Sequence, residues 1–162
     1  MNEAFFLTDP EQMICTHLPD DPAWQLLHQP RTQEQYENYV YIRERFFQLG
    51  MNMIPDKSKE DVIQQTKGGE VDIIFGVPKD NVKDMQYRYL LFRNRQRGDS
   101  PAHIPFERFV FYQKTANDIK YNAKFPIKGR FKLDIFGQNE KDHETFDLCA
   151  SYLVDCNDPQ AN

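Results

Sequence analysis

The feature that most constrains the fold is a strict alternation of apolar and polar residues around position 120. Every second residue from Ile119 to Phe125 is apolar, and the residues between them are Lys120, Asn122 and Lys124. Because successive side chains of a β-strand point to opposite faces, this pattern predicts a strand with one buried face and one solvated face.

The same alternation recurs from about Arg45 onward and predicts about seven strands. They are Phe46–Met53, Val71–Val77, Tyr87–Leu91, Phe109–Phe111, Ile119–Phe125, Phe131–Ile135 and Leu148–Val154. In the fourth of these strands, Phe109 and Phe111 are expected to share the buried face. Short strands with one polar face each predict a mainly β protein, an immunoglobulin-like antiparallel β-sandwich.

One connection is expected to carry the chain from one sheet of this sandwich to the other. It is the corner from Phe125 to Phe131, which contains Pro126 and Gly129. Phe131 stands where immunoglobulin folds often keep a tyrosine, so we expect a structural role for it. The Cys…Trp…Cys core of antibody domains is absent, and the expected likeness is therefore one of architecture.

The first part of the chain has a different pattern and predicts a short helical arm. A helix capped by Asp9 has to end before Pro19, after about two turns. Thr32 and Gln35 have the spacing of a capping box and predict a second helix through about Tyr39. Helices this short need a larger body to pack against. The expected division is a helical lead-in (1–42), a sandwich (43–158) and a tail (159–162).

Positive charge is concentrated in residues 86–132, which carry 11 basic and 3 acidic side chains between two acidic flanks. We favour the interpretation that this segment pairs with the flanks as a self-complementary surface. The alternative is a patch for an acidic protein partner, with Arg93, Arg95 and Arg97 as the candidate binding loop. Arginines interleaved with aromatic residues also occur in nucleic-acid-binding proteins, but a sequence pI of about 5.4 argues against nucleic acid as the partner.

No pattern in the sequence predicts a catalytic or metal site. Cys15 and His17 are two residues apart, which on a helix directs them about 200° apart. Cys149 and Cys156 fall on opposite faces of one expected strand, which argues against a disulfide between them. The acidic run at residues 140–144 lacks the spacing of a calcium loop and is expected to be a solvated hairpin tip. We therefore expect buried, unreactive cysteines and no cofactor or metal.

The sequence also indicates a cytoplasmic location. No apolar run approaches the ~18 residues of a membrane span. The N-terminus lacks the basic and apolar regions of a secretory signal. Three cysteines and no Asn-x-Ser/Thr sequon fit a reducing compartment, so we expect a protein that does not bind membranes.

Three segments near the N-terminus carry a resemblance to a known family. They are Phe5–Glu11, His17–Asp21 and Trp24–Leu27. They resemble the passage that follows the catalytic part of the transglutaminase-like domain in the kyphoscoliosis peptidase and hillarin family, cytoplasmic proteins associated with the cytoskeleton. Phe125–Phe136 and Tyr152–Cys156 are similar to the all-β module that comes next in that family.

This resemblance implies that the arm leads in from a preceding transglutaminase-like domain. The Cys-His-Asp triad of the family belongs to that domain and would lie upstream of Phe5, so no catalytic role carries over to this chain. The side chains of Trp24, Leu26 and Leu27 would form an apolar plug that docks the lead-in onto the sandwich. Trp24→Ala would then lower the free energy of unfolding by about 3–5 kcal/mol.

Two functions from different classes follow from these observations. The first is a non-catalytic protein-interaction module that binds a cytoskeletal partner. The second is an accessory domain that stabilises an upstream cysteine peptidase or transglutaminase domain of the same chain, or shapes its substrate cleft. A third and weaker hypothesis is a nucleic-acid or anionic-lipid binder through residues 86–132, whose affinity would fall steeply with salt.

Overall fold

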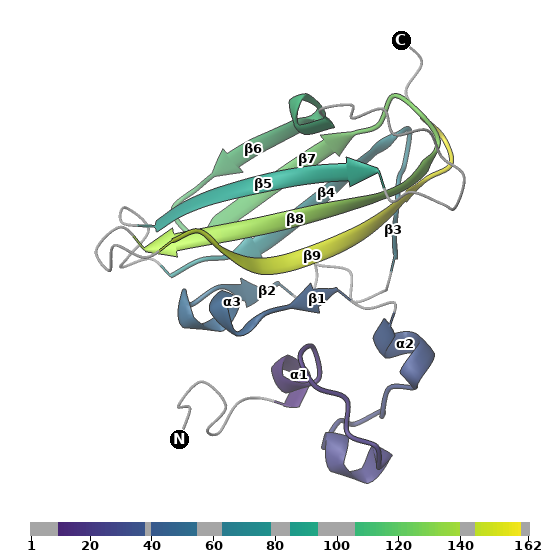
Figure 1. Ribbon diagram of the computed structural model, residues 1–162, viewed down its shortest axis with the longest axis vertical. Coiled ribbons are helices and arrows are strands. Elements are labelled where there is room, and N and C mark those ends of the chain that lie inside the picture. The colour runs from purple at the N-terminus through teal and green to yellow at the C-terminus, as the bar shows by residue number, and fades with distance from the viewer. Residues whose placement is uncertain are drawn as a thin grey trace.

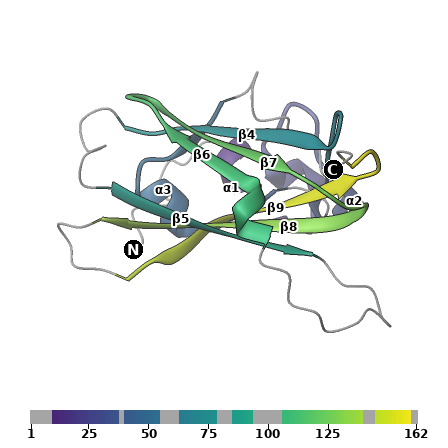
Figure 2. The same cartoon turned by 90° about the horizontal axis from the view of Figure 1, so that it is seen from above.

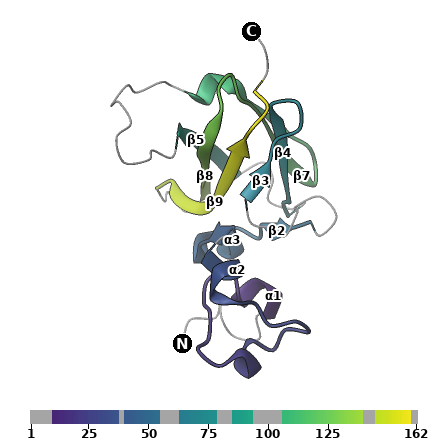
Figure 3. The ribbon, with the colours of Figure 1, turned by 90° about the vertical axis from the view of Figure 1, so that its right-hand side faces the viewer.

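The computed structural model describes six stretches of the 162-residue chain. They are residues 10–37, 40–54, 63–78, 85–93, 106–139 and 145–159. Two sheets pack face to face, and Figure 2 shows them edge-on as two layers. The helical arm lies beyond one end of these layers, below them in Figure 3.

The nine strands in the described stretches are divided between the two sheets (Figure 1). The first sheet contains β1 (Tyr41–Ile42), β9 (Asp147–Cys156), β8 (Gly129–Asn139) and β5 (Met85–Arg93) in that order, and β3 (Ile63–Gln65) pairs with β9 in parallel. The second contains β2 (Asn52–Met53), β4 (Glu70–Gly76), β7 (Asp118–Lys124) and β6 (Val110–Lys114).

This strand order is that of a constant-type immunoglobulin domain. The order β2-β4-β7-β6 corresponds to A-B-E-D, and β5-β8-β9 corresponds to C-F-G. The predicted immunoglobulin-like sandwich is therefore confirmed. More strands are present than the alternation predicted, because three short strands precede β4: β1 and β3 pair with β9 in the first sheet, and β2 pairs with β4 in the second.

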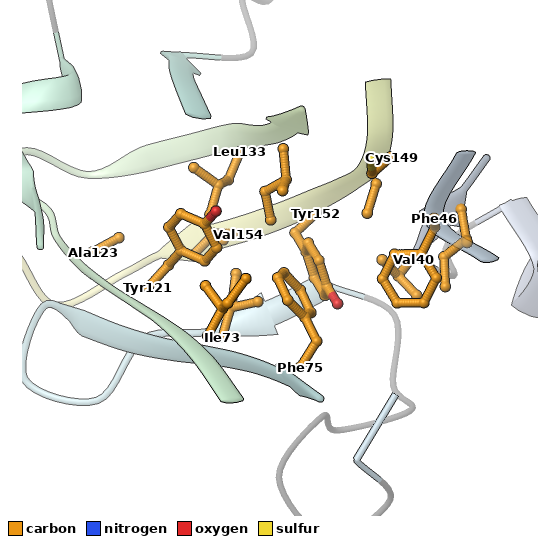
Figure 4. Packing of buried hydrophobic residues seen from close by; sticks show 14 of the residues in the cluster. Val40, Phe46, Ile73, Phe75, Tyr121, Ala123, Leu133, Cys149, Tyr152 and Val154 are labelled. Atoms are coloured by element: carbon orange, nitrogen blue, oxygen red, sulfur yellow. The ribbon is translucent and has the colours of Figure 1, made fainter. Parts of the chain in front are cut away.

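The core lies between the sheets and is formed by the inner faces that the alternation predicted. The buried sets are Val71, Ile73, Phe75 and Val77 from β4 and the residue after it, Ile119, Tyr121 and Ala123 from β7, Phe131, Leu133 and Ile135 from β8, and Ala150, Tyr152 and Val154 from β9. At its centre the Phe75 ring lies 5.8–5.9 Å from the rings of Phe46, Tyr121 and Tyr152 (Figure 4). Offset and edge contacts of this kind add to the burial of large rings.

The corner after β7 crosses between the sheets, as predicted. β7 belongs to the second sheet and β8 to the first, and Phe125 and Phe131 face each other across the corner with ring centroids 4.5 Å apart. Both rings are fully buried, which agrees with the structural role expected of Phe131. Gly129 has φ of 148°, a conformation that a residue with a Cβ rarely adopts.

The expected strand over Phe46–Met53 is wrong. Residues Glu44–Gln48 form the helix α3, and only Asn52–Met53 are extended. The helix ends in a Schellman motif, because the Gly50 N–H donates to Phe47 O and the Met51 N–H donates to Phe46 O. Gly50 has φ of 68°, so the local turn chemistry, which alternation does not detect, decides the structure here.

The expectation that Phe109 and Phe111 share the buried face is also wrong, because Phe109 packs against the core and Phe111 does not. Residues Phe106–Phe109 form the short 3₁₀ helix η3, and β6 starts only at Val110. Val110 and Tyr112 therefore face the interior, and the Phe111 side chain is 66% exposed. A shift of one residue moves every side chain of a strand to the other face.

The arm contains three short helices in the described stretches: α1 (Pro10–Met13), η2 (Pro22–Gln25) and α2 (Gln33–Glu37). The predicted capping box is confirmed, since the Gln35 N–H donates to Thr32 Oγ1 and the Thr32 N–H donates to Gln35 Oε1. α1 is shorter than the expected two turns. Asp9 and Tyr39, the expected outer ends of the two helices, lie outside the described residues. No described helix combines the length and apolarity needed to cross a membrane.

Candidate interaction surfaces

All three cysteines, the candidate nucleophiles of the chain, are buried free thiols. Burial raises the pKa of Cys149 to about 12, so this residue stays a neutral thiol near pH 7. It lies beside a register shift between β8 and β9, close to Gly137. The expectation that the cysteines are buried and not disulfide-bonded is confirmed.

Metal ligands do not gather in the part of the chain that the structure describes. No group of three His, Cys, Asp or Glu side chains in that part is placed to hold an ion. The acidic run at residues 140–144 lies outside it.

The expected plug in the arm is wrong for Trp24 and Leu26. Their side chains are 75% and 76% exposed, and Leu27 is the partly buried residue that packs on the core. The buried residue between them is Gln25, at 5% exposure. The apolar composition of Trp24–Leu27 suggested burial, but the backbone turns these two large side chains outward.

The loop that carries Trp24 is held in place by hydrogen bonds at both ends. At its start the Asp21 carboxylate accepts from the Ala23 N–H at 2.9 Å. At its end Gln25 Nε2 donates to Arg31 O at 2.9 Å, and the Arg31 N–H donates to Gln25 Oε1 at 2.7 Å. We call residues 21–31 the Trp24 loop.

Leu26 adopts a backbone conformation that few leucines adopt. It is in the left-handed region, with φ of 56° and ψ of 18°. For a residue with a Cβ this conformation costs about 1–2 kcal/mol. The hydrogen bonds of Gln25 hold the neighbouring backbone, so the Trp24 loop presents Trp24 and Leu26 to solvent on a fixed support.

Ion pairs of the kind expected for a self-complementary surface are present, and the alternative of a patch for an acidic protein partner stays a prediction. Basic residues of the 86–132 segment pair with acidic residues from both flanks: Lys120 with Asp72 at 2.6 Å, Lys124 with Glu70 at 3.7 Å, Arg130 with Asp155 at 2.7 Å and Lys132 with Asp134 at 3.2 Å. These pairs lie across neighbouring strands or within β8, and they involve four of the 11 basic residues of the segment.

The candidate arginine loop is only partly described. Arg93 ends β5, is exposed, and lies over Gly129, where an added Cβ would be 3.2 Å from its Nε atom. Arg95 and Arg97 lie outside the described residues. Their role in binding stays a prediction.

A second surface feature was missed by the sequence analysis. A hollow of about 430 Å³ lies on the second sheet, where η3 joins β6. It is lined by Arg108, Phe109, Val110, Phe111, Asn122 and Lys124. The sequence analysis did not predict this hollow, because it assigned Phe111 to the buried face of β6.

Comparison with known proteins agrees with this architecture. The chain is 29% identical to hillarin from Drosophila melanogaster over 136 residues, which is 83% of this chain and 16% of hillarin. It is 26% identical to the Lim and transglutaminase domain protein ltd-1 from Caenorhabditis elegans over 138 residues, 85% of this chain and 19% of ltd-1. It is also 26% identical to human kyphoscoliosis peptidase over 157 residues, 96% of this chain and 20% of that protein.

The chain thus spans a fifth or less of the length of these relatives. A family model described as the KY-like, immunoglobulin-like domain matches residues 33–162, which include all the strands of both sheets. The chain therefore belongs to the family of KY-like, immunoglobulin-like domains.

Proposed function

We propose that this chain is a non-catalytic protein-interaction module of a cytoskeleton-associated, transglutaminase-like protein. The observation that carries the proposal is the exposure of Trp24 and Leu26 on the Trp24 loop. Tryptophan is among the residues that most often dominate the binding energy of protein interfaces. A loop held by Gln25 and Asp21 loses little conformational entropy when a partner covers it.

The proposal assigns no chemical step to this chain. The pKa of Cys149 is raised by burial, and Cys15 is likewise inaccessible to a substrate. The partner is a protein, with no nucleic acid or membrane involved, and the location is the cytoplasm. A thiol-dependent peptidase or crosslinking activity that Cys15→Ser abolishes would overturn the non-catalytic assignment.

The alternative is an accessory domain that stabilises a preceding transglutaminase-like domain of the same protein or shapes its substrate cleft. It is favoured by the position of the Trp24 loop, which lies ahead of the family match that starts at residue 33. The similarity to kyphoscoliosis peptidase spans 157 of the 162 residues and so includes this loop. In this alternative Trp24 and Leu26 contact the preceding domain rather than a separate protein.

The test immobilises the chain, passes cytosolic and cytoskeletal extract over it at physiological salt, and identifies the retained proteins by mass spectrometry. The variant is Trp24→Ser with Leu26→Ser. The matched control is Leu90→Ser with Phe92→Ser, which removes two exposed apolar side chains of the first sheet. Retention of filament proteins by the wild type and the control, but not by the variant, is the expected result.

If the folded chain retains nothing, the interaction module is refuted and the accessory role is tested in the longer protein. The same Trp24 and Leu26 changes are then made there, and the melting temperature of the transglutaminase-like domain is measured. A lower melting temperature in that variant, with none in the Leu90 and Phe92 control, supports the accessory role. Equal melting temperatures refute it.

A further inference from the structure

The hollow on the second sheet is separate from the Trp24 loop and points to a second binding surface. Phe111 forms one wall and is 66% exposed, a large aromatic side chain facing solvent from the middle of a short strand. β6 is the last strand of its sheet, so the hollow opens at the edge of the sandwich. Its lining residues come from η3, β6 and β7. Figure 1 shows the short coil of η3 leading into the start of β6.

Cationic side chains surround Phe111 on this face. Phe111 is opposite Asn122 in the β6–β7 register, so Lys120 and Lys124 are its diagonal neighbours on the same face. Arg108 belongs to η3, which precedes β6, and its guanidinium carbon lies 4.7 Å from the centre of the Phe109 ring. None of the described residues that line the hollow carries a carboxylate.

The two cations of the hollow itself are poorly neutralised. Arg108 is exposed and makes no ion pair with any described residue. Lys124 Nζ is 3.7 Å from Glu70, and both side chains are about half exposed, so this pair is weak. Lys120 differs, because it contacts Asp72 at 2.6 Å and that carboxylate also accepts from Asn122.

We propose that this hollow binds an extended acidic segment of a partner protein. An apolar side chain of the segment packs on Phe111, and carboxylates on either side of it contact Arg108 and Lys124. In an extended chain, side chains two residues apart lie on one face about 6.5–7 Å apart. An apolar residue with an acidic residue two positions away on each side can therefore contact Phe111, Arg108 and Lys124 together.

Single-stranded nucleic acid is the other ligand that uses aromatic and cationic side chains together. It is disfavoured because Glu70 and Asp72 lie on the same face, one strand beyond Lys124 and Lys120, where a phosphate backbone would meet them. The net charge of the chain is also −5. A short peptide meets fewer of these carboxylates, because Lys124 is its one contact on β7 and the pair of Lys124 with Glu70 is long, at 3.7 Å.

The test starts with a phage library of random 12-residue peptides panned on the 162-residue chain. Enriched peptides are then measured by fluorescence anisotropy against Phe111→Ala and Arg108→Glu. Phe92→Ala is the matched control for the first variant, because it removes an exposed phenylalanine of the other sheet. Arg88→Glu is the control for the second, because Arg88 is also exposed and stacks on a phenylalanine ring, at 4.1 Å.

We expect enriched peptides that carry a large apolar residue with Asp or Glu two positions away. Phe111→Ala and Arg108→Glu should each weaken their binding about tenfold or more, and the two controls should change it less than about twofold. The proposal is overturned if no acidic consensus emerges, or if binding survives Phe111→Ala. It is also overturned if a 12-nucleotide oligothymidylate binds more tightly than the peptides at physiological salt.

This surface stands apart from the proposed role of the Trp24 loop, and the same assay separates them. The Trp24→Ser, Leu26→Ser variant should bind the enriched peptides as the wild type does. Loss of peptide binding in that variant, while the chain remains folded, would place the peptide site on the arm and overturn the assignment to the hollow.

Discussion

At the centre of the sandwich large aromatic side chains contact one another in the core, whereas in the arm the largest side chain of all faces solvent. Phe75 is fully buried among three other rings, and Trp24 is 75% exposed. The sandwich is held mainly by apolar burial between two sheets. The Trp24 loop is held by polar contacts, of which the paired hydrogen bonds of Gln25 to Arg31 are the most buried.

This difference shows that apolar composition predicts burial in the strands of the sandwich but not in the Trp24 loop. In a strand, the position of a residue in the alternation determines which face it occupies, and burial follows. In the Trp24 loop the one turn of 3₁₀ helix, η2, is too short to form a periodic face, and the backbone conformation fixed by polar contacts directs each side chain. Large apolar residues of such a segment can then remain exposed, where they can contact a partner and contribute little to the stability of the fold.

The largest effect should come from the centre of the sandwich. Phe75→Ala removes a ring that contacts Phe46, Tyr121 and Tyr152, and we expect it to lower the free energy of unfolding by about 3–5 kcal/mol. Denaturant unfolding followed by circular dichroism measures this loss. Phe111→Ala is the control, with an expected change within about 0.5 kcal/mol because that ring is exposed. Similar losses in both variants would contradict the assigned faces of β4 and β6.

The next effect concerns the polar support of the arm. Gln25→Ala removes both hydrogen bonds to the Arg31 backbone in a buried setting, and we expect a loss of about 1–3 kcal/mol in the local stability of the Trp24 loop. Amide hydrogen exchange at Arg31 measures it. Gln33→Ala is the matched control, because its amide donates to Glu37 on an exposed helix surface. Unchanged exchange at Arg31 in Gln25→Ala would show that other contacts hold this loop.

A smaller effect is expected at the start of α2. Thr32→Ala removes the acceptor for the Gln35 N–H in the capping box and should destabilise the arm by about 1 kcal/mol. Thr32→Ser keeps the hydroxyl and should retain most of the stability. Exchange at the Gln35 amide reports this difference, and equal exchange in the Ala and Ser variants would mean that the cap does not stabilise the helix.

The same contrast explains which parts of the fold the sequence pattern predicted correctly. Alternation identified the inner faces of β4, β7 and β8 because these depend on local periodicity. The corner from Phe125 to Phe131 was identified from Pro126 and Gly129 between two expected strands. Alternation failed at Phe46, where a Schellman turn at Gly50 favours a helix. It also failed at Phe111, where the preceding 3₁₀ helix shifts the strand by one residue.

The candidate surfaces were harder to predict than the fold. The arm motif around Trp24 indicated an important segment, but composition alone suggested that its apolar residues were buried. Their exposure depends on the contact of Gln25 with Arg31, six residues away, which no periodic pattern encodes. The hollow likewise depends on residues of η3 and β7 that come together only in the folded sheet.

The smallest effect on stability, and the one that decides most about function, is expected for Trp24→Ala. In the isolated chain it should change the free energy of unfolding by no more than about 0.5 kcal/mol, because the indole is already largely in water. Trp24 is the only tryptophan, so fluorescence of the native protein reports this side chain alone. Its emission should be as accessible to acrylamide in the folded chain as in denaturant, and it should shift to the blue and become protected when a partner covers the loop. Protection from acrylamide in the isolated folded chain, or a loss of several kcal/mol in the variant, would restore the buried plug that the sequence suggested and remove the basis for a docking role of the arm.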